Sequence, residues 1–498
     1  MRTKKRINGL FSHGLSLLAG AGITLALAPF DLWPLAIVSL ALLQYLLDDT
    51  PPRTSFLTGW LFGLGLFGSG ASWVYVSIHE YGNADAPLAV FLTFIFVSGL
   101  ALLPGFACWL YTRWFSHTNL SRWLAFPACW LLIEWSRSWL LTGFPWLYTG
   151  YSLLDTPAVG WAPVVGVTGL GLLIGISASS LYLLTTTTPS RLKSIAIVFS
   201  LSLWAAGPLL STVNWTRQSA PAISVALIQP NIAQQLKWEP EAYRDNISQL
   251  QELSSSVKSA DLIIWPEAAI PRVYQYASDV SQLEQQKAIS GGHTWISGVI
   301  WQETIEGKNL HYNSVVAVDE SSSVYHKQRL VPFGEYVPLS SLLRGIIDFF
   351  NLPMSSMSRG DTDQPLLQAG NLSISPSICY EVVYPDLVAS RAANADLLLT
   401  LSNDSWFGDS LGPKQHFQMA RMRAVENSRY MIRGTNNGIS AIINHRGKVQ
   451  VQGGQFIAEV VTGVATPMKG ITPFSRWGSW PTVLLCLCAL FIAALRRR

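Results

Sequence analysis

Eight long apolar segments constrain the fold of this chain more than any other feature. A helix that crosses the hydrocarbon core of a bilayer needs about 20 mostly apolar residues. Charged residues are 13% of the 498 residues, against about 25% in a typical soluble domain. The sequence therefore predicts a membrane protein with a soluble part, and it excludes a disordered chain. The segments cover approximately residues 13–30, 33–47, 56–78, 87–112, 123–141, 163–185, 193–211 and 478–495.

The placement of lysine and arginine predicts the topology. Basic residues cluster before the first apolar segment, at 2–6, and after the last, at 496–498. Cytoplasmic loops carry an excess of such residues, so both termini should be cytoplasmic, which eight spans allow. The loop 77–87, which would then face outward, has no Lys or Arg. We therefore expect a multi-pass protein of a bacterial inner membrane, with residues 212–470 in the periplasm.

The organisation follows from this topology. We expect a transmembrane domain at 1–211 with about seven helices, a soluble domain at 212–470, and a transmembrane helix with a basic tail at 471–498. Residues 222–468 alternate between strand-like and helical stretches, which indicates an α/β layered domain. Helices are expected at 241–258 and 415–427. Strands are expected at 223–229, 261–265, 295–300, 314–318, 373–379, 396–401 and 439–444.

Three short segments of the soluble region combine a reactive side chain with an apolar strand. Glu267 follows the strand-like Ile264-Trp265-Pro266, and Cys379 ends a strand. Lys327 is the second residue of the run from His326 to Tyr336. Cys379 is the only one of five cysteines outside the apolar segments, so this region has no internal disulfide. A Glu can take the thiol proton, and a Lys can stabilise an oxyanion. Together they form a complete acyl-transfer site.

These segments resemble the Glu-Lys-Cys sites of the nitrilase (carbon-nitrogen hydrolase) superfamily, over residues 222–468. That resemblance implies an α-β-β-α sandwich and a thioester on the cysteine. The whole chain resembles the apolipoprotein N-acyltransferase family, in which several spans precede a nitrilase-like domain and one follows it. Further segments carry this resemblance: Gln229-Pro230-Asn231-Ile232 leading to Lys237-Trp238, Asn403-Asp404-Ser405-Trp406-Phe407-Gly408, and the run from Gln415 to Ala424.

The resemblance implies a role for each matching residue. Glu267 would be the general base, Lys327 would stabilise the tetrahedral intermediate, and Cys379 would be the nucleophile. Glu335 would hold Lys327. The pocket would include Trp238, Tyr380 and Glu381.

The same resemblance implies the reaction and its partners. A phospholipid would give an acyl chain to the cysteine, and the α-amino group of a diacylglyceryl-modified apolipoprotein would receive it. We expect no cofactor, no metal and no nucleic acid, and a monomer in the bilayer.

Two features carry weaker hypotheses. Glu134 and Arg137 lie three residues apart in the fifth segment, so one helix face carries both. Arg137 either binds a phospholipid headgroup or only anchors the helix. An apolar loop is a candidate lipid-contacting lid or an ordinary packed loop. Its residues are Phe349, Phe350, Met354 and Met357.

Two other functions stay open at this point. A membrane-tethered amidase or nitrilase that hydrolyses small amides would share the triad, but a tether needs only one span. A transporter or receptor would need charged or broken helices at mid-membrane, and Glu134 and Arg137 are the main charges there. Finally, His416 could pair with Cys379, although Glu267 and Lys327 already supply the chemistry.

Overall fold

A computed structural model describes residues 9–336 and 356–495 of the chain. These residues form two compact units. The first, the helical unit, comprises 1–75, 85–213 and 477–498, and the second, the sandwich unit, comprises 76–84 and 214–476, in each case as far as the chain is described. The short segment 76–84 thus clusters with the sandwich unit, although it lies between apolar helices in the sequence.

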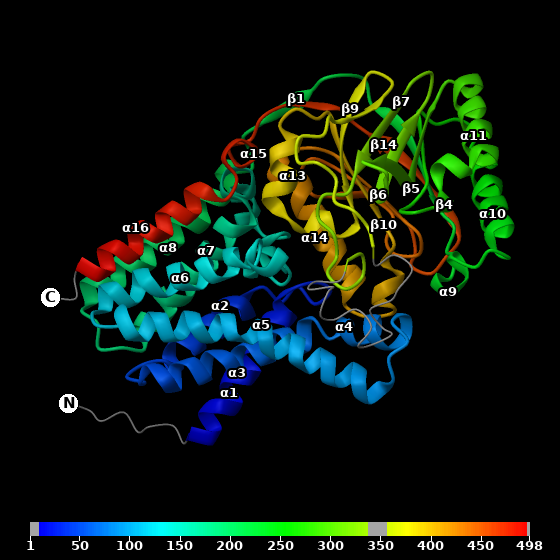
Figure 1. Cartoon of the computed structure of the whole chain (residues 1–498). Helices are drawn as coiled ribbons and strands as arrows, with labels where there is room; N and C mark the ends of the chain where they lie inside the picture. Colours follow the sequence, from blue (N-terminus) through cyan, green and yellow to red (C-terminus); the bar gives the residue numbers. More distant parts are fainter. Residues whose placement is uncertain (1–8, 337–355, 496–498) are drawn as a thin grey trace. The chain divides into compact units, whose positions relative to one another are not determined.

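The helical unit contains a helix at each of the eight predicted segments (Figure 1). Small residues let some of these helices approach closely, as is common in membrane proteins. A Cβ added to Gly20 would lie 1.9 Å from the carbonyl oxygen of Phe62, and one added to Gly65 would lie 1.9 Å from that of Leu17. The helices are α1 (Gly9–Ala26), α2 (Pro34–Leu46), α3 (Pro52–Gly70), α5 (Ala86–Trp114), α6 (Asn119–Ser136), α7 (Ala162–Leu184), α8 (Ser190–Leu210) and α16 (Trp480–Leu495).

The lengths of these helices bear on the prediction of eight full spans. Among the described residues, four helical stretches are long and apolar enough to cross a membrane: Gly9–Ala26, Ala86–Trp114, Pro157–Leu184 and Ser190–Leu210. A fifth is possible where Pro52–Gly70 is followed, after a 55° bend, by Trp73–Tyr81. Hydropathy does not register such a bend, and α2 and α16 are apolar but shorter. The even-span topology therefore stays a prediction.

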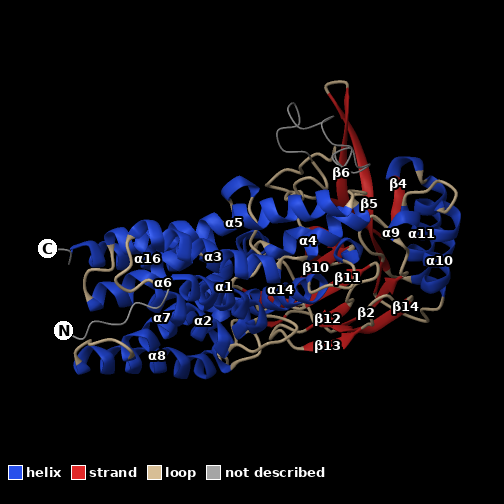
Figure 2. Ribbon diagram, turned by 90° about the horizontal axis from the view of Figure 1, so that it is seen from below, coloured by secondary structure: helices blue, strands red, loops and turns tan. Residues whose placement is uncertain are grey.

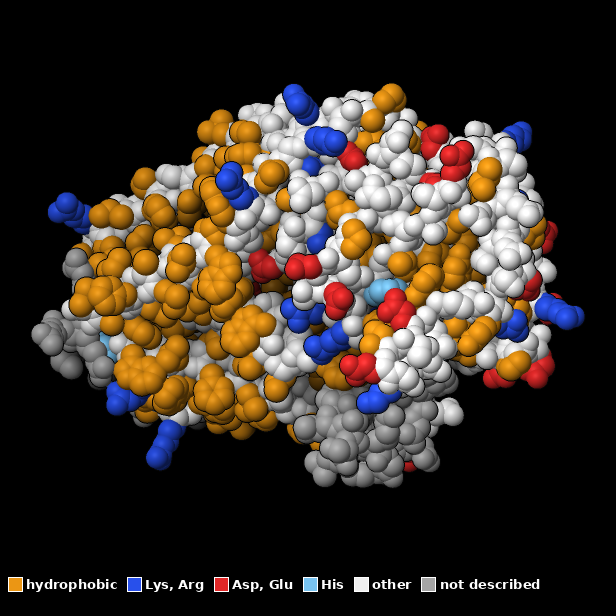
Figure 3. Space-filling view, turned by 45° about the horizontal axis from the view of Figure 1, so that its top comes forward, with side chains coloured by type: hydrophobic (Ala, Val, Ile, Leu, Met, Phe, Trp, Pro, Cys, Tyr) orange, Lys and Arg blue, Asp and Glu red, His pale blue; other side chains and the backbone are white. Residues whose placement is uncertain are grey.

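Apolar side chains cover much of the visible face of the helical unit, where Figure 3 shows broad hydrophobic areas. Large side chains on α5 are among the most exposed, with Val90, Phe91 and Phe94 each more than half exposed. Exposed apolar patches of this extent mark contact with a membrane or a partner. This surface agrees with the membrane-protein composition.

The sandwich unit contains two large sheets, counted over the described residues. One has the strand order β13 (Val449–Gln452), β12 (Ala441–Ile443), β11 (Met431–Thr435), β10 (Leu397–Ser402), β9 (Leu372–Ile378), β8 (Leu367–Ala369). The other has the order β14 (Glu459–Ala465), β2 (Ile223–Gln229), β3 (Leu262–Ile264), β5 (Thr294–Ile305), β6 (Lys308–Val318), β7 (Ser322–His326), with β4 (Ile270–Val273) beside β5. A short pair joins β1 (Thr216–Gln218) to β15 (Met468–Gly470).

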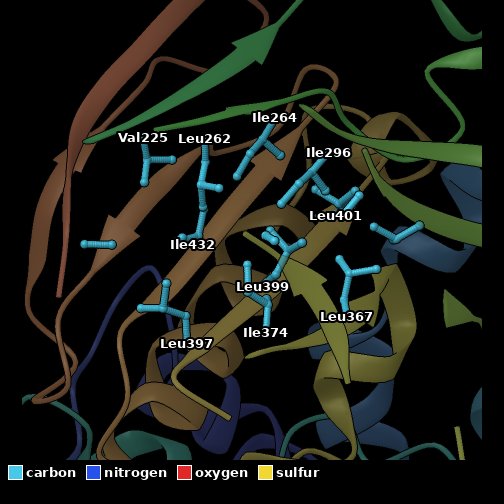
Figure 4. Packing of buried hydrophobic residues seen from close by; sticks show 14 of the residues in the cluster. Val225, Leu262, Ile264, Ile296, Leu367, Ile374, Leu397, Leu399, Leu401 and Ile432 are labelled. Carbon is cyan, nitrogen blue, oxygen red and sulfur yellow. The ribbon is translucent and has the colours of Figure 1, made fainter. Parts of the chain in front are cut away.

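The main core lies between the two sheets. Figure 4 shows apolar side chains of β2, β3 and β5 facing those of β9, β10 and β11. Leu399 and Leu401 belong to one sheet and Ile264 and Ile296 to the other, and all four are fully buried in one cluster. Side chains two residues apart on a strand share a face, so this alternation of leucines directs both into the core.

Helices cover the outer faces of both sheets. α10 (Tyr243–Ser255) and α11 (Ser278–Gly291) pack on the β2–β3–β5 sheet (Figure 2). Beneath them, Trp265 and Trp295 meet at 5.2 Å between ring centroids. α13 (Pro385–Ala392) and α14 (Gly412–Asn427) lie against the other sheet. The α-β-β-α architecture implied by the resemblance is therefore confirmed.

Shorter helices are α4 (Trp73–Val76), α9 (Gln234–Lys237), α15 (Pro473–Trp477), η1 (Ser77–Tyr81), η2 (Leu140–Thr142), η3 (Thr149–Leu153), η4 (Pro157–Trp161), η5 (Tyr274–Tyr276), η7 (Cys379–Val383) and η8 (Asp404–Phe407).

Candidate active site

The three predicted catalytic residues all lie just beyond the last residues of strands in the sandwich unit. Glu267 follows β3, Lys327 follows β7 and Cys379 follows β9. β3 runs parallel to β5, and β7 shares that direction because it is two antiparallel steps away. Sites in α/β proteins form at the carboxyl ends of strands, where loops replace the regular hydrogen-bond ladder. The fold therefore places Glu267, Lys327 and Cys379 each at the carboxyl end of a strand.

Glu267 is held on both carboxylate oxygens. Its Oε1 accepts from the side-chain amide of Asn313 at 2.8 Å, and its Oε2 accepts from the backbone N–H of Asn403 at 2.8 Å. The loop around Glu267 also packs directly on β5, since a Cβ on Gly298 would lie 2.6 Å from the Glu267 Cα atom. Glu267 therefore has one orientation, set by residues from three separate parts of the chain.

Lys327 is buried and sits between two carboxylates. Its Nζ atom lies 2.8 Å from Oε1 of Glu335 and 3.6 Å from Oε1 of Glu267. Burial works to lower the pKa of Lys327, but the charges of Glu335 and Glu267 outweigh it and raise that pKa above its usual range. The residue is therefore a fixed ammonium group. Glu335 is itself placed by the N–H of Val331, which donates to its Oε2 at 2.8 Å.

Cys379 has an unusual backbone and a protonated thiol. Its φ is +51°, in the left-handed region that favours glycine. Burial of the thiol and the charge of Glu267 raise the pKa of Cys379 to about 12, while Lys327 acts in the opposite direction. Both charges thus act on the thiol, as expected if the three groups share one site. A base is needed to generate the thiolate at neutral pH.

Glu381 joins the strand end that carries Cys379 to the one that carries Lys327. Its Oε2 accepts from the N–H of Ile378 at 2.7 Å. Its Oε1 accepts from the N–H groups of Gln328 at 2.6 Å and Arg329 at 3.2 Å, and from the hydroxyl of Tyr325 at 2.9 Å. The side chain is fully buried. Through these backbone hydrogen bonds, Glu381 sets the spacing between the segments that carry Lys327 and Cys379.

The remaining predicted pocket residues lie near this site. Tyr380 directly follows Cys379 and packs edge-on against Tyr384, at 5.3 Å between ring centroids. Trp238 is partly exposed and follows Lys237, whose Nζ atom donates to the carbonyl oxygen of Glu267 at 2.8 Å. Burial lowers the pKa of Lys237 to about 8. Lys237 therefore brings the segment with Trp238 against Glu267.

Sequence reasoning missed Asn313 and Asn403, which orient Glu267. Asn313 also donates to Oε1 of Glu335 at 2.9 Å, so one amide bridges both carboxylates. Its signal in the sequence is weak: asparagine is depleted in strands, yet Asn313 lies inside β6. The contact from Asn403 comes from a backbone N–H, which no side-chain pattern reveals.

The weaker predictions have mixed outcomes. Arg137 is buried in the helical unit, where its Nη1 donates to the carbonyl oxygen of Trp146 at 2.6 Å. Its guanidinium lies 4.9 Å from the ring centroid of Tyr148 and 3.8 Å from a Glu134 oxygen. These contacts favour anchoring within the unit over a headgroup contact. The lid residues Phe349, Phe350 and Met354 lie outside the described residues.

His416 contacts the backbone of Cys379. Its Nε2 lies 3.2 Å from the Cys379 carbonyl oxygen, and its Nδ1 lies 3.0 Å from Asp404. In the described part of the chain, no group of three or more His, Cys, Asp or Glu side chains is arranged to hold a metal ion.

Family models and relatives match this chain over nearly its full length. Residues 19–180 match the apolipoprotein N-acyltransferase N-terminal domain, and residues 224–467 match the carbon-nitrogen hydrolase domain. A Pseudomonas syringae apolipoprotein N-acyltransferase is 44% identical over 97% of this chain and 96% of its own length. The chain belongs to the apolipoprotein N-acyltransferase family.

Other members of the apolipoprotein N-acyltransferase family agree. The Azotobacter vinelandii protein is 46% identical, covering 97% of this chain and 95% of its own length. The Photobacterium profundum protein is 39% identical, covering 100% and 97%. Among solved structures, a nitrilase-superfamily protein of Saccharomyces cerevisiae covers 51% of this chain and 93% of its own, with 17% identity and a TM-score of 0.38. The family assignment rests on the full-length relatives alone.

Proposed function

We propose that this protein transfers an acyl chain from a membrane phospholipid to the N-terminal amine of a diacylglyceryl-modified apolipoprotein, through a thioester on Cys379. The observation that carries the proposal is the grouping of Glu267, Lys327 and Cys379 at strand ends, with both charges acting on the thiol. The full-length relatives, which are named apolipoprotein N-acyltransferases, support the same substrates.

The first half-reaction forms the thioester. Glu267 takes the proton from the Cys379 thiol as the sulfur attacks the ester carbonyl of the phospholipid. The tetrahedral intermediate collapses when the carbon–oxygen bond to the glycerol backbone breaks, and the proton passes from Glu267 to the departing lysophospholipid oxygen. The raised pKa of Cys379 makes such a base necessary, because the free thiol holds its proton at neutral pH.

Lys327 stabilises the oxyanion of that intermediate. Its ammonium charge is kept by Glu335, at 2.8 Å, which leaves Glu267 as the weaker partner at 3.6 Å. A fixed charge in a buried site acts more strongly than one in water and needs no reorganisation during the reaction. Glu335 is thus a positioning residue, whereas Lys327 is catalytic.

The second half-reaction transfers the acyl chain. The neutral α-amino group attacks the thioester carbonyl, Glu267 accepts a proton from the attacking nitrogen, and the carbon–sulfur bond breaks to release Cys379. Glu267 returns this proton to the Cys379 thiolate as the amide product leaves. An α-amino group has a pKa of about 8, so a substantial neutral fraction exists near that pH.

We further propose that the enzyme acts as a monomer in the bacterial inner membrane, with residues 212–470 in the periplasm. The basic residues at both chain ends support this orientation. Maleimide labelling of intact spheroplasts tests it with two exposed sites, Ser290→Cys in α11 and Thr187→Cys between α7 and α8. An impermeant reagent should label the first and spare the second. The reverse pattern would overturn the orientation.

Intact mass measurement tests the proposed reaction. The purified protein is incubated with phospholipid, beside a Cys379→Ser control. We expect a gain of one acyl chain that hydroxylamine removes and that the control lacks. Adding a diacylglyceryl peptide should remove the gain from the protein and add it to the peptide.

The same experiment separates transfer from hydrolysis. Loss of the acyl chain at the same rate without the peptide, with free fatty acid as the product, would indicate a hydrolase and contradict the proposal. A gain of mass that also persists in Cys379→Ala, which has no nucleophile at this position, would place the acyl chain on another residue.

A further inference from the structure

The backbone of Cys379 adopts a conformation that the residue does not favour by itself. Its φ of +51° places the nucleophile in the left-handed region, which an L-residue with a Cβ atom disfavours. Such conformations persist where the surrounding structure imposes them. The contacts of the Cys379 backbone therefore matter for the position of its sulfur.

His416 provides one of those contacts by donating a hydrogen bond. Its Nε2 atom lies 3.2 Å from the carbonyl oxygen of Cys379. A carbonyl oxygen only accepts hydrogen bonds, so Nε2 must carry the hydrogen, whether the ring is neutral or charged. The tautomer of His416 follows from this contact.

The opposite nitrogen of the ring is held by a buried ion pair. Nδ1 lies 3.1 Å from Nη2 of Arg433 and 3.0 Å from Oδ1 of Asp404. Burial and the Arg433 charge lower the pKa of His416, against the pull of Asp404, which favours the neutral ring. A neutral ring with hydrogen on Nε2 accepts from Arg433 through Nδ1. In the charged ring, Nδ1 would instead donate to Oδ1 of Asp404, and Nε2 carries hydrogen in both forms.

The ion pair is itself rigid and closed to solvent. Nη2 of Arg433 donates to Oδ2 of Asp404 at 2.7 Å, and the Ser402 hydroxyl donates to Oδ1 at 2.7 Å. His416 and Arg433 are 0% exposed and Asp404 is 2% exposed. The three side chains come from α14, β11 and η8, so the fold fixes the ring from three elements.

We propose that His416 is a positioning residue for acyl transfer, which orients the peptide between Cys379 and Tyr380 through its Nε2 hydrogen bond. This inference rests on the proposed function. A trans peptide is planar, so its N–H points opposite to its carbonyl. The bond to the carbonyl oxygen therefore also fixes the direction of the Tyr380 N–H and, through the shared Cα atom, the start of the Cys379 side chain.

A general-base role for His416 predicts different behaviour. A base needs a ring nitrogen without hydrogen that faces the thiol, whereas Nε2 carries hydrogen and Nδ1 is engaged by Arg433. A positioning role requires only a donor at the Nε2 position. The amide nitrogen of glutamine reaches about as far along the side chain as Nε2, whereas phenylalanine fills the space without a donor.

The test compares His416→Gln with His416→Phe in the full-length protein in detergent. The rate of thioester formation is measured by intact mass at several phospholipid concentrations and pH values. We expect His416→Phe to lower kcat by about 10- to 100-fold without changing KM, as misplacement of a reacting group does. His416→Gln should keep most of the rate and the pH profile of the unsubstituted protein. His293→Gln, between α11 and β5, serves as a matched control.

Two outcomes would overturn the inference. Equal loss of rate in both variants, with unchanged thermal midpoints, would show that the ring itself and not its donor is required, as for a base. Unchanged rates in both would show that the contact has no effect. Where His416→Phe does not fold, His416→Asn carries the same expectation, because its shorter amide cannot reach the Cys379 carbonyl.

Alkylation of Cys379 separates failure of this inference from failure of the proposed function. Absence of any thioester in the unsubstituted protein contradicts the function alone. Iodoacetamide then still probes the thiol, and its rate at a fixed pH should change by more than about threefold in His416→Phe but not in His416→Gln. Equal alkylation rates in all three proteins would overturn the positioning role.

Discussion

Lys327 is closer to Glu335 than to the proposed general base. Its Nζ atom lies 2.8 Å from Glu335 and 3.6 Å from Glu267, and Asn313 donates to both carboxylates. The lysine charge is thus paired mainly with Glu335, which lies outside the proposed path of proton transfer. This arrangement leaves Glu267 able to accept a proton while an ammonium group stays in the site.

Replacing Glu335 should therefore reduce the rate of acyl transfer. In Glu335→Gln the ammonium of Lys327 moves toward Glu267, which then becomes a weaker base. We expect kcat for thioester formation to fall by about 100-fold, within the range of a lost acid–base contribution. Intact mass against time measures this rate. Glu320→Gln, an exposed carboxylate, serves as the control, and an unchanged rate in Glu335→Gln would refute the assigned role.

Glu381 should matter more for stability than Glu335 does. In Glu381→Gln an amide replaces one of the two oxygens that accept backbone N–H groups of Ile378, Gln328 and Arg329. A buried donor without an acceptor costs about 1–3 kcal/mol, so the thermal midpoint should fall by several degrees. Differential scanning fluorimetry in detergent compares the two variants. A larger fall for Glu335→Gln would contradict this ranking.

The thiol of Cys379 should react slowly at neutral pH. Because the pKa of Cys379 is raised to about 12, its alkylation by iodoacetamide should accelerate steadily above pH 9 and show no plateau near 8.5. Peptide mapping follows this residue separately from the four other cysteines. A plateau between pH 7 and 9 would show that the thiolate forms more easily than the site geometry indicates.

The same shift should also affect stability at alkaline pH. The folded thiol retains its proton between an unfolded pKa of about 8.5 and a folded pKa of about 12, whereas the unfolded thiol loses it. The folded state therefore binds more protons in this window, and the free energy of unfolding decreases as pH rises through it. Cys379→Ala removes this contribution. The thermal midpoint of the variant, relative to that of the unsubstituted protein, should therefore rise between pH 8.5 and pH 10. A constant difference would contradict the shift.

Arg137 should stabilise the helical unit without affecting lipid affinity. Arg137→Met leaves the buried Glu134 without its cation, and removal of one partner of a buried pair costs about 3–5 kcal/mol. We expect a lower thermal midpoint, partly restored in Glu134→Gln/Arg137→Met, and an unchanged KM for phospholipid. A raised KM with an unchanged midpoint would instead support the headgroup contact.

Much of the fold follows from local patterns. The strand 223–229 has the predicted bounds, and α14 includes the whole predicted helix 415–427. Apolar runs identified every long helix of the helical unit, because burial in lipid or protein demands the same hydropathy. They did not give the number of full spans, because α2 and α16 are short and the helix after Gly70 bends.

The residues of the predicted triad are recognisable because short motifs surround them, but their partners are set by the tertiary structure. Asn313 and Glu267 are 46 residues apart in the chain, and Asn403 and Glu267 are 136 apart. Nothing local to any of these residues indicates the pairing. The left-handed backbone at Cys379 and the buried contact from His416 are likewise produced by packing between elements. Hydropathy and motifs are local properties, whereas the orientation of a reactive group depends on groups that only folding brings together.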